Sequence, residues 1–319
     1  MKTITSADGI YKLGPKEFAA FFGVSKKDIP SDCLDIINQN NFCFRKINPN
    51  KRDEIILKII RAINSGSLFS VGGEDGKKIW KTKWSEHLAR FTKSGYDLNT
   101  LTPEFFKTGD IVRYNGDFFI AGDQKFKLNF YRVLRRWLFR RYLGKVDNVY
   151  EFGCGTSYNL VELAQLYPDK KLYGLDWVRP ALDMIKLIVK KYGYNMHSGI
   201  FDMFSPDLNL EVKPNSAFFT TGALEQLGRD FNPFLEFILA KSPKVVIDVN
   251  SFVELYDPNK LTDHLTLLFN EKRDYLDGYI TALRNLEKKG RIKIHKINNL
   301  KLGTLFQNGS SYVIWSPKN

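Results

Sequence analysis

The stretch that decides the fold is Val149-Tyr150-Glu151-Phe152-Gly153-Cys154-Gly155-Thr156-Ser157. A short apolar run ends near a carboxylate, two glycines follow one residue apart, and a helix-like apolar segment begins directly afterwards. Because glycine lacks a Cβ, the backbone can turn sharply there and approach a ligand closely. A helix that starts after such a turn presents free N–H groups to that ligand. The stretch therefore predicts a strand, a ligand-binding loop and a helix.

Two details of this glycine loop disfavour a dinucleotide as the ligand. The nicotinamide pattern needs a third glycine three residues after the second, and this chain has Tyr158 there. Glu151 also places a carboxylate two residues before Gly153, where it would repel a pyrophosphate and attract an ammonium group. S-Adenosylmethionine carries an ammonium and a sulfonium but no phosphate, so it fits the loop better.

The second half of the chain alternates strand and helix patterns, which is typical of a parallel sheet with crossover helices. The expected strands are 147–152, 171–176, 194–200, 216–221 and 244–249, and the expected helices between them are about 157–167, 179–192 and 231–241. A long helical run is expected over about 259–289, interrupted near Gly278, and two last strands at 291–297 and 311–316. A plain dinucleotide-binding fold does not need this terminal strand pair.

Two further carboxylates follow the second and third expected strands. Asp176 ends the second strand, where a carboxylate can accept both ribose hydroxyls of a nucleoside that lies across the strand ends. Asp202 follows the third strand and can accept from an adenine amino group, with Phe201 or Met203 against the ring. Taken singly, these residues could be helix caps and tight turns. Taken together with Glu151, they favour a nucleoside-binding site.

With these motifs the sequence resembles the class I S-adenosylmethionine-dependent methyltransferases over about residues 125–319. The resemblance rests on EFGCGTS, GLD and GIFD as the first, second and third motifs. It implies a Rossmann-like α/β fold with a seven-stranded sheet, helices on both faces, and S-adenosyl-L-methionine as the cofactor. The residues expected to bind this cofactor are Glu151, Gly153, Gly155, Asp176, Trp177, Phe201, Asp202, Met203 and Thr221. Ser157 departs from the family, because many members have a third glycine there.

Candidates for catalysis follow the fourth and fifth expected strands, beside the expected position of the sulfonium. Methyl transfer is a displacement at carbon, so orientation supplies much of the catalysis, and a hydroxyl acceptor gains from a base. Glu225 is the first candidate, although an acid in a first helical turn is also favoured electrostatically. Asn250 and Glu254 are the next candidates after Glu225, and His264 is the histidine candidate.

Motifs that are missing after the fourth and fifth expected strands limit the class of acceptor. The segment TTGALEQ after the fourth strand has no Asn/Asp-Pro-Pro-aromatic motif, which disfavours methylation of exocyclic base nitrogens. No cysteine follows the fourth or fifth strand, which disfavours the cysteine-nucleophile route to carbon-5 of a base. The long helical run and the closing GSSYVIWSP are loosely similar to methyltransferases of surface-polysaccharide and other sugar pathways, and Arg273 and Tyr275 could bind an anionic or sugar-like group. We therefore expect O-methylation of a small polar acceptor such as a sugar or nucleotide-sugar. An RNA methyltransferase and a non-catalytic S-adenosylmethionine-binding module stay open.

Composition limits the class of protein. The 319 residues are 43% hydrophobic and carry a formal charge of +13, so the chain can build a core and its excess charge favours an acidic partner. No apolar stretch approaches the ~20 residues of a membrane span, and the start MKTITSADGI has no apolar core typical of a secretory signal. Cys33, Cys43 and Cys154 lack a paired metal spacing. A soluble cytoplasmic protein without a metal site is expected.

The first half carries most of the positive charge and has a different pattern. Residues 1–123 are expected to form a mainly helical cap that shapes the acceptor site, and residues 124–319 the cofactor-binding domain. The cap should contain helices over 15–28 and 53–66, a glycine-rich loop over 66–80, and a hairpin in 110–120 that turns at Asn115-Gly116.

Residues 124–146 contain eight Lys/Arg and no acidic residue. At helical spacing Arg132, Arg135, Arg136 and Arg140 share one side, and apolar residues occupy the other. Such a face could follow RNA phosphates, lie on an anionic membrane, or be solvated while its other side packs on the sheet. The solvated face is the favoured interpretation.

Overall fold

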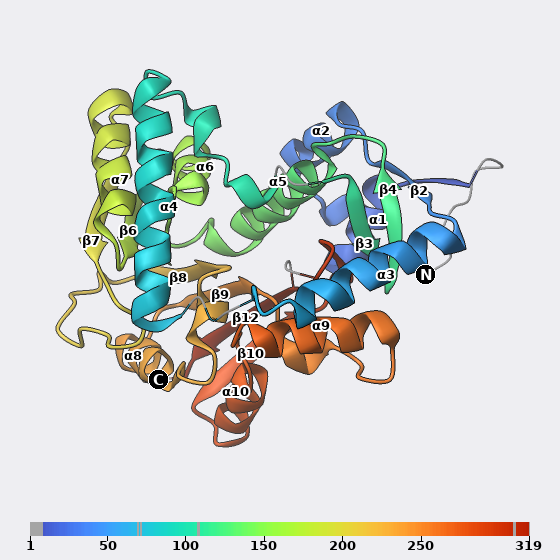
Figure 1. Ribbon diagram of the computed structural model, residues 1–319. Helices are drawn as coiled ribbons and strands as arrows, with labels where there is room; N and C mark the ends of the chain where they lie inside the picture. Colours follow the sequence, from blue (N-terminus) through green and yellow to red (C-terminus); the bar gives the residue numbers. More distant parts are fainter. Residues whose placement is uncertain (1–8, 69, 71, 107–108, 309–310, 319) are drawn as a thin grey trace.

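A seven-stranded sheet lies at the centre of the second half of the chain, in the order β10-β12-β9-β8-β5-β6-β7 (Figure 1). Its parallel strands are β5 (Asn148–Phe152), β6 (Lys171–Asp176), β7 (Met196–Ile200), β8 (Ser216–Thr221) and β9 (Val245–Asn250). β12 (Ser311–Pro317) runs antiparallel to β9, and β10 (Ile292–Asn298) runs antiparallel to β12. The computed structural model thus confirms the predicted fold class and all seven strands; it describes residues 9–68, 70, 72–106, 109–308 and 311–318.

Helices cover both faces of this sheet, as predicted. One face is covered by α5 (Phe126–Leu138), α6 (Tyr158–Leu166) and α7 (Arg179–Tyr192), and the other by α8 (Asn232–Lys241) and α10 (Tyr279–Lys288). Side chains of a strand alternate between the faces, so Val149 packs in the first core and Tyr150 in the second. Both faces are apolar, which explains the nearly continuous apolar runs of the central strands.

The long helical run forms two helices instead of one. α9 (Leu261–Lys272) ends before residues 273–278, and Gly278, with φ 88°, precedes α10. α9 leaves the sheet and packs against α3 (Pro49–Asn64) through an isoleucine- and phenylalanine-rich cluster. The predicted break at Gly278 is therefore confirmed, and it turns α10 back onto the sheet.

A smaller antiparallel sheet, in the order β1-β2-β4-β3-β11, joins the first half to the second (Figure 1). Its strands are β1 (Ile10–Lys12), β2 (Cys43–Lys46), β4 (Asp117–Ala121), β3 (Ile111–Tyr114) and β11 (Leu302–Gly303). The hairpin β3–β4 was predicted from Asn115-Gly116, which both have positive φ. β11 comes from the segment between β10 and β12, so the small sheet is built from both halves of the chain.

The remaining helices of the first half differ in part from the prediction. α1 (Pro15–Phe22) ends earlier than expected, because Gly23 takes the left-handed conformation that ends helices. α3 starts at Pro49, where the side chain of Asn48 accepts from the N–H of Lys51 at 2.8 Å. The other helices of the first half are α2 (Ser31–Gln39) and α4 (Gly73–Lys93), with the 3-10 turns η1 (Lys26–Asp28), η2 (Leu98–Leu101) and η3 (Glu104–Phe106). Two further 3-10 turns, η5 (Leu224–Leu227) and η6 (Val253–Leu255), lie in the second half.

The predicted loop over 66–80 is wrong for its second part, because α4 begins at Gly73. Glycine at positions 73 and 76 lowers helix propensity, but α4 packs along α7 (Figure 1) and buries His87 and Phe91. Tertiary packing therefore overrides the local glycine signal. Among the described residues, no helix combines the length and apolar character that crossing a membrane would require.

The predicted solvated face of the basic helix is wrong for Arg135, which is buried, while Arg132 and Arg136 are half-buried and Arg140 is exposed. Arg135 is only 2% exposed and pairs with Glu162 of α6. Arg136 bridges Glu162 and Asp32 of α2 at 2.5 and 3.0 Å, and Arg140 reaches Asp32 at 2.9 Å. The helix continues as one π-helical turn, η4 (Phe139–Leu143). These charges join α2, α5 and α6 to one another.

Candidate active site

The glycine loop connects β5 to α6 and has little free space around it. Gly153 and Gly155 have φ of 70° and 50°. A Cβ on Gly153 would lie 2.2 Å from the Cβ of Ala223, and one on Gly155 would lie 2.8 Å from the ring of Trp84. Ser157 also adopts positive φ, 62°, at the position where the family resemblance expects glycine. The serine keeps the glycine-like conformation, so the departure in sequence leaves the loop shape intact.

Glu151 is a buried carboxylate, and one of its two oxygens lacks a hydrogen-bond partner among the described residues. Its Oε1 accepts from Nδ2 of Asn159 at 2.6 Å, and Oδ1 of Asn159 accepts in turn from Tyr131 and Arg135 at 3.0 and 3.2 Å. Its Oε2 has no hydrogen-bond partner among the residues that the structure describes. Burial raises the pKa of Glu151 to about 8, against the effects of Asn159 and the Arg135 charge. A cationic ligand would stabilise the ionised form of Glu151 and offset the cost of burying its charge.

Asp176 ties the end of β6 to the glycine loop. Its two oxygens accept from the N–H groups of Gly155 and Val178 at 3.0 and 3.1 Å. Burial raises the pKa of Asp176 to about 6, and these amides together with that of Trp177 oppose the rise. Asp176 also contributes to the raised pKa of Glu151, so the two carboxylates are close. Asp176, which is predicted to bind the ribose, therefore lies beside Glu151, which is predicted to bind the ammonium group.

The residues expected around adenine separate into two groups. Phe201 is 5% exposed and its ring lies 4.9 Å from the rings of Phe152 and Phe237, so it packs in the core and its contact with the adenine ring stays a prediction. The terminal methyl of Met203 approaches Gly153, to within 3.8 Å of where a Cβ would lie. Asp202 keeps a side chain that is 30% exposed. Asp202 and Met203 therefore remain at the candidate site.

The helix α4 covers this site and was not predicted there. Trp84 lies against Gly155, and Nζ of Lys77 lies 3.9 Å from the carboxylate of Asp202. Trp177, next to Asp176, stacks on Phe204 with ring centroids 5.8 Å apart. The only local signal in the sequence was the pair Trp80 and Trp84 at helical spacing, inside a segment that its glycines made look like a loop.

Glu225 lies in η5, where side chains from several elements meet. Burial raises its pKa to about 7, opposed first by the amide of Ser251 and then by the charge of Arg273 and the side chain of Gln307. Tyr275 is also adjacent, since burial and then the charge of Glu225 raise its pKa to about 12. A carboxylate with a pKa near neutrality can take up a proton at physiological pH. The predicted Arg273 and Tyr275 thus lie beside the predicted base.

Three other candidates behave differently. Asn250 is fully buried at the end of β9, with Nδ2 3.4 Å from Oγ1 of Thr220. Oε1 of Glu254 accepts from the N–H of Ile280 at 2.8 Å and so caps the start of α10, which disfavours a catalytic role, although its buried Oε2 has no partner among the described residues. His264 is exposed on α9, whose buried side packs towards α3, which disfavours a catalytic role for it as well.

The glycine loop and Glu225 share the carboxyl edge of the parallel strands. The strand order reverses between β5 and β8, and ligands of open α/β sheets bind in the crevice at such a switch point. Thr221 ends β8 there, and its buried hydroxyl oxygen has no partner among the described residues. The order β10-β12-β9-β8-β5-β6-β7 with antiparallel β12 is that of the class I methyltransferases, so the chain has the class I methyltransferase fold.

Comparison with known proteins adds weak similarity only. No family model matches the chain, and no curated protein matches it. A SAM-dependent methyltransferase from Aquifex aeolicus is similar at 15% identity and a TM-score of 0.41, over 57% of this chain and 88% of that one. Geranyl diphosphate C-methyltransferase from Streptomyces coelicolor A3(2) has 12% identity and a TM-score of 0.45, over 62% and 86%. The small RNA methyltransferase HEN1 is similar at 16% identity and a TM-score of 0.44, over 60% of this chain and 25% of that one.

Proposed function

We propose that the chain is an S-adenosylmethionine-dependent methyltransferase. The observation that carries this proposal is Glu151, a buried carboxylate beside the glycine loop whose Oε2 has no partner among the described residues. Burying such a group without compensation is unfavourable, and the ammonium of the cofactor's methionine part would supply both charge and donors. A phosphate-bearing cofactor would be repelled at the same place.

The residues that would hold this cofactor follow from the geometry of the loop. Glu151 would bind the ammonium, and Gly153 and Gly155 would allow the backbone to approach it. Asp176, which already accepts two backbone N–H groups, would accept the ribose hydroxyls with its remaining lone pairs. Asp202 would accept from the adenine amino group. The bound cofactor would supply a methyl group on a sulfonium.

The acceptor in this proposal is a small polar molecule such as a sugar or nucleotide-sugar, methylated on oxygen. The buried side-chain amides of Asn250, at the end of β9, and of Asn308 each have an oxygen without a donor among the described residues. Hydroxyl groups would satisfy such oxygens. Glu225 would take the proton of the acceptor hydroxyl while the oxygen of that hydroxyl takes the methyl group from the sulfonium. Arg273 and Tyr275 would orient the rest of the acceptor.

The first test is calorimetric titration with S-adenosylhomocysteine, with NAD as the control ligand. We expect stoichiometric binding of S-adenosylhomocysteine alone. Absence of binding to the folded protein would reject the cofactor and favour a non-catalytic interaction role.

The catalytic role of Glu225 has its own test. Glu225→Gln should bind S-adenosylhomocysteine like the wild type but turn over on the order of 10²- to 10⁴-fold more slowly, the typical contribution of a general base. Glu254→Gln is the matched control, because Glu254 caps α10, and its turnover should be near that of the wild type. Full activity of Glu225→Gln would remove Glu225 from the base role.

An RNA acceptor is less well supported by the arrangement of charges. Arg135, Arg136 and Arg140 are engaged in ion pairs with Glu162 and Asp32, so this face of α5 does not offer them to phosphates. Salt-sensitive binding of RNA would nevertheless favour this alternative. A cytoplasmic setting is part of the proposal, since the three cysteines carry free thiols.

A further inference from the structure

A buried arginine of α5 lies against the start of α6, the helix that follows the glycine loop. Arg135 is 2% exposed, and its Nη1 donates to the carbonyl oxygen of Tyr158 at 3.0 Å and to Oδ1 of Asn159 at 3.2 Å. Its Nη2 donates to Oε2 of Glu162 at 2.5 Å, and its guanidinium carbon lies 3.9 Å from the centre of the Tyr158 ring. One guanidinium thus contacts three residues near the N-terminus of α6.

This position is unfavourable for a cation. The N-terminus of a helix carries partial positive charge, and one carboxylate partner does not always offset the cost of taking a guanidinium out of water. The neighbouring Arg136 already joins α5 to Glu162 at 2.5 Å and to Asp32 at 3.0 Å. What distinguishes Arg135 from Arg136 among the described residues is its contact with Tyr158 and with the amide of Asn159.

The contact with Arg135 decides which way the amide of Asn159 points. A guanidinium has donors and no acceptor, so the end of the amide that faces Arg135 has to be the oxygen, Oδ1. The hydroxyl of Tyr131 donates to the same oxygen at 3.0 Å. The NH₂ end is therefore directed at Glu151, where Nδ2 of Asn159 donates to Oε1 at 2.6 Å. The reverse orientation would set Oδ1 against the carboxyl group, which can donate to it only when it is protonated.

These contacts leave one defined atom of Glu151 for a ligand. Its Oε1 is engaged by Asn159, and its buried Oε2 has no partner among the described residues. The hydrogen bond from Asn159 and the charge of Arg135 both oppose the rise in the pKa of Glu151 that burial causes. Both therefore favour the ionised carboxyl group that an ammonium ligand requires.

We propose that Arg135 is a positioning residue for the amino-acid end of the cofactor site, and that it acts through Asn159, whose amide holds Oε1 of Glu151 and leaves Oε2 for an ammonium group. The proposal rests on the proposed function, in which Glu151 binds the ammonium of the cofactor. Arginine suits this place, because its planar fork reaches Asn159 and Glu162 at once, whereas a lysine ammonium is a single point. The basic helix α5 would thus contribute to cofactor recognition through α6.

The experiment compares two ligands that differ in the amino-acid part. Calorimetry at neutral pH gives the affinities for S-adenosylhomocysteine and for 5′-methylthioadenosine, which keeps the adenosine and the sulfur but has no amino-acid part. The wild type should prefer S-adenosylhomocysteine. In Arg135→Met we expect this preference to fall about tenfold or more, the size of one lost hydrogen bond to a charged group. The affinity for 5′-methylthioadenosine should stay near that of the wild type.

The link through Asn159 is tested from its other end. Asn159→Leu changes the volume little and removes both the acceptor for Arg135 and the donor to Glu151, so it should lower the preference in the same way. Because both substitutions break one chain of contacts, the double variant should fall no further than Asn159→Leu alone.

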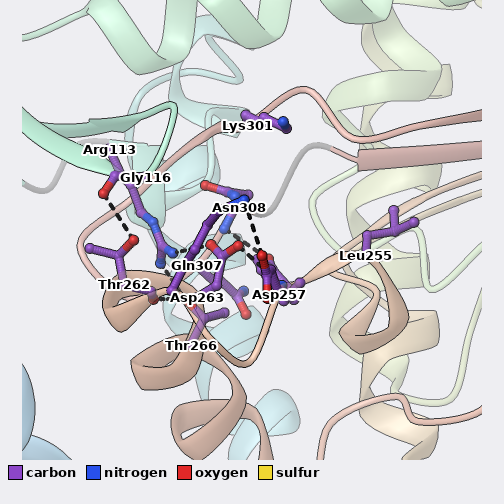
Figure 2. A network of polar contacts seen from close by, with 12 residues as sticks. Arg113, Gly116, Leu255, Asp257, Thr262, Asp263, Thr266, Lys301, Gln307 and Asn308 are labelled. Carbon is purple, nitrogen blue, oxygen red and sulfur yellow. Dashed lines mark hydrogen bonds and ion pairs between the residues drawn. The ribbon is translucent and has the colours of Figure 1, made fainter.

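Two other arginine variants are the matched controls. Arg136→Met removes the second bond to Glu162 and leaves the amide of Asn159 in place, so its preference should equal that of the wild type. Arg113 is another buried arginine, 1% exposed, which points from β3 towards α9 and pairs with Asp263 at 2.8 Å (Figure 2). Arg113→Met should lower stability without changing the preference, which separates a general loss of stability from a loss of positioning.

Several results would overturn the proposal. These are an unchanged preference in a folded Arg135→Met, an additional fall in the double variant, or an equal fall in Arg136→Met or Arg113→Met. If Arg135→Met does not fold, an unchanged preference in Asn159→Leu is decisive against it. A wild type that binds neither ligand would reject the proposed function itself. A wild type that prefers S-adenosylhomocysteine, with variants that keep this preference, would leave the function standing and reject only the role of Arg135.

Discussion

Replacing Glu151 by glutamine should stabilise the ligand-free protein and weaken cofactor binding at the same time. The substitution keeps an oxygen that can accept from Nδ2 of Asn159, as Oε1 of Glu151 does at 2.6 Å. It removes the charge that burial disfavours and that raises the pKa of Glu151 to about 8. It also removes the counter-ion that we assign to the cofactor's ammonium. A residue kept for folding alone would not show these opposite effects.

The size and sign of the stability effect follow from the pKa. Between pH 4.5, the ordinary value for glutamate, and pH 8, the native protein keeps a proton that the unfolded chain releases. The free energy of unfolding therefore falls as the pH rises through this window. At about 1.4 kcal/mol per unit, the full difference is on the order of 5 kcal/mol above pH 8. Glu151→Gln should recover up to this amount at pH 8.5 and almost none at pH 5.

The assay is thermal unfolding of the ligand-free protein at pH 5 and pH 8.5. Each kcal/mol should raise Tm by about 2 °C in a chain of this size. Glu162→Gln is the contrasting control, because the charges of Arg135 and Arg136 outweigh burial and lower the pKa of Glu162. That variant should be destabilised to a similar extent at both pH values, since the stability given by a lowered pKa is present above the ordinary value of 4.5 and both pH values lie above it.

Binding gives a second readout for Glu151. An ammonium ligand needs the ionised carboxylate, so affinity for S-adenosylhomocysteine should fall about tenfold per pH unit below about 8 in the wild type and not in Glu151→Gln. A lower Tm of Glu151→Gln at pH 8.5, or wild-type affinity in this variant, would refute the reasoning.

Three further predictions concern the loop and the basic helix. Asp176→Ala should weaken S-adenosylhomocysteine binding by at least ~1–3 kcal/mol in calorimetry; unchanged affinity would discard its ribose role. Arg135→Met should lower the free energy of unfolding in denaturant by about 1.5–3 kcal/mol, the range of a hydrogen bond to a charged group, because Glu162 loses one buried partner and keeps Arg136; a neutral effect would contradict the structural role of this pair. Ser157→Gly should stabilise by about 1 kcal/mol or more, since φ of 62° strains serine; a loss of stability would show that its hydroxyl matters more.

The sequence signals for the cofactor half of the proposed site are local. The end of a strand, a turn and the start of a helix follow one another closely around Gly153, Asp176 ends a strand, and Asp202 comes two residues after the next strand. Parallel strands bring their carboxyl ends to one edge, so these positions converge once the strand order is known. The carboxylates of Glu151 and Asp176 are indeed close in the structure.

Tertiary structure alone decided the roles of isolated side chains. Arg113 pairs with Asp263 across 150 residues, and Arg135 pairs with Glu162 instead of meeting solvent. Helical periodicity reports which side of a helix differs from the other, but it does not report what covers that side. Glu254 and Glu225 likewise look equivalent in sequence, as carboxylates that follow strands. Their separation into a helix cap and a candidate base depends on contacts with α10 and with Gln307, which only the folded chain brings together.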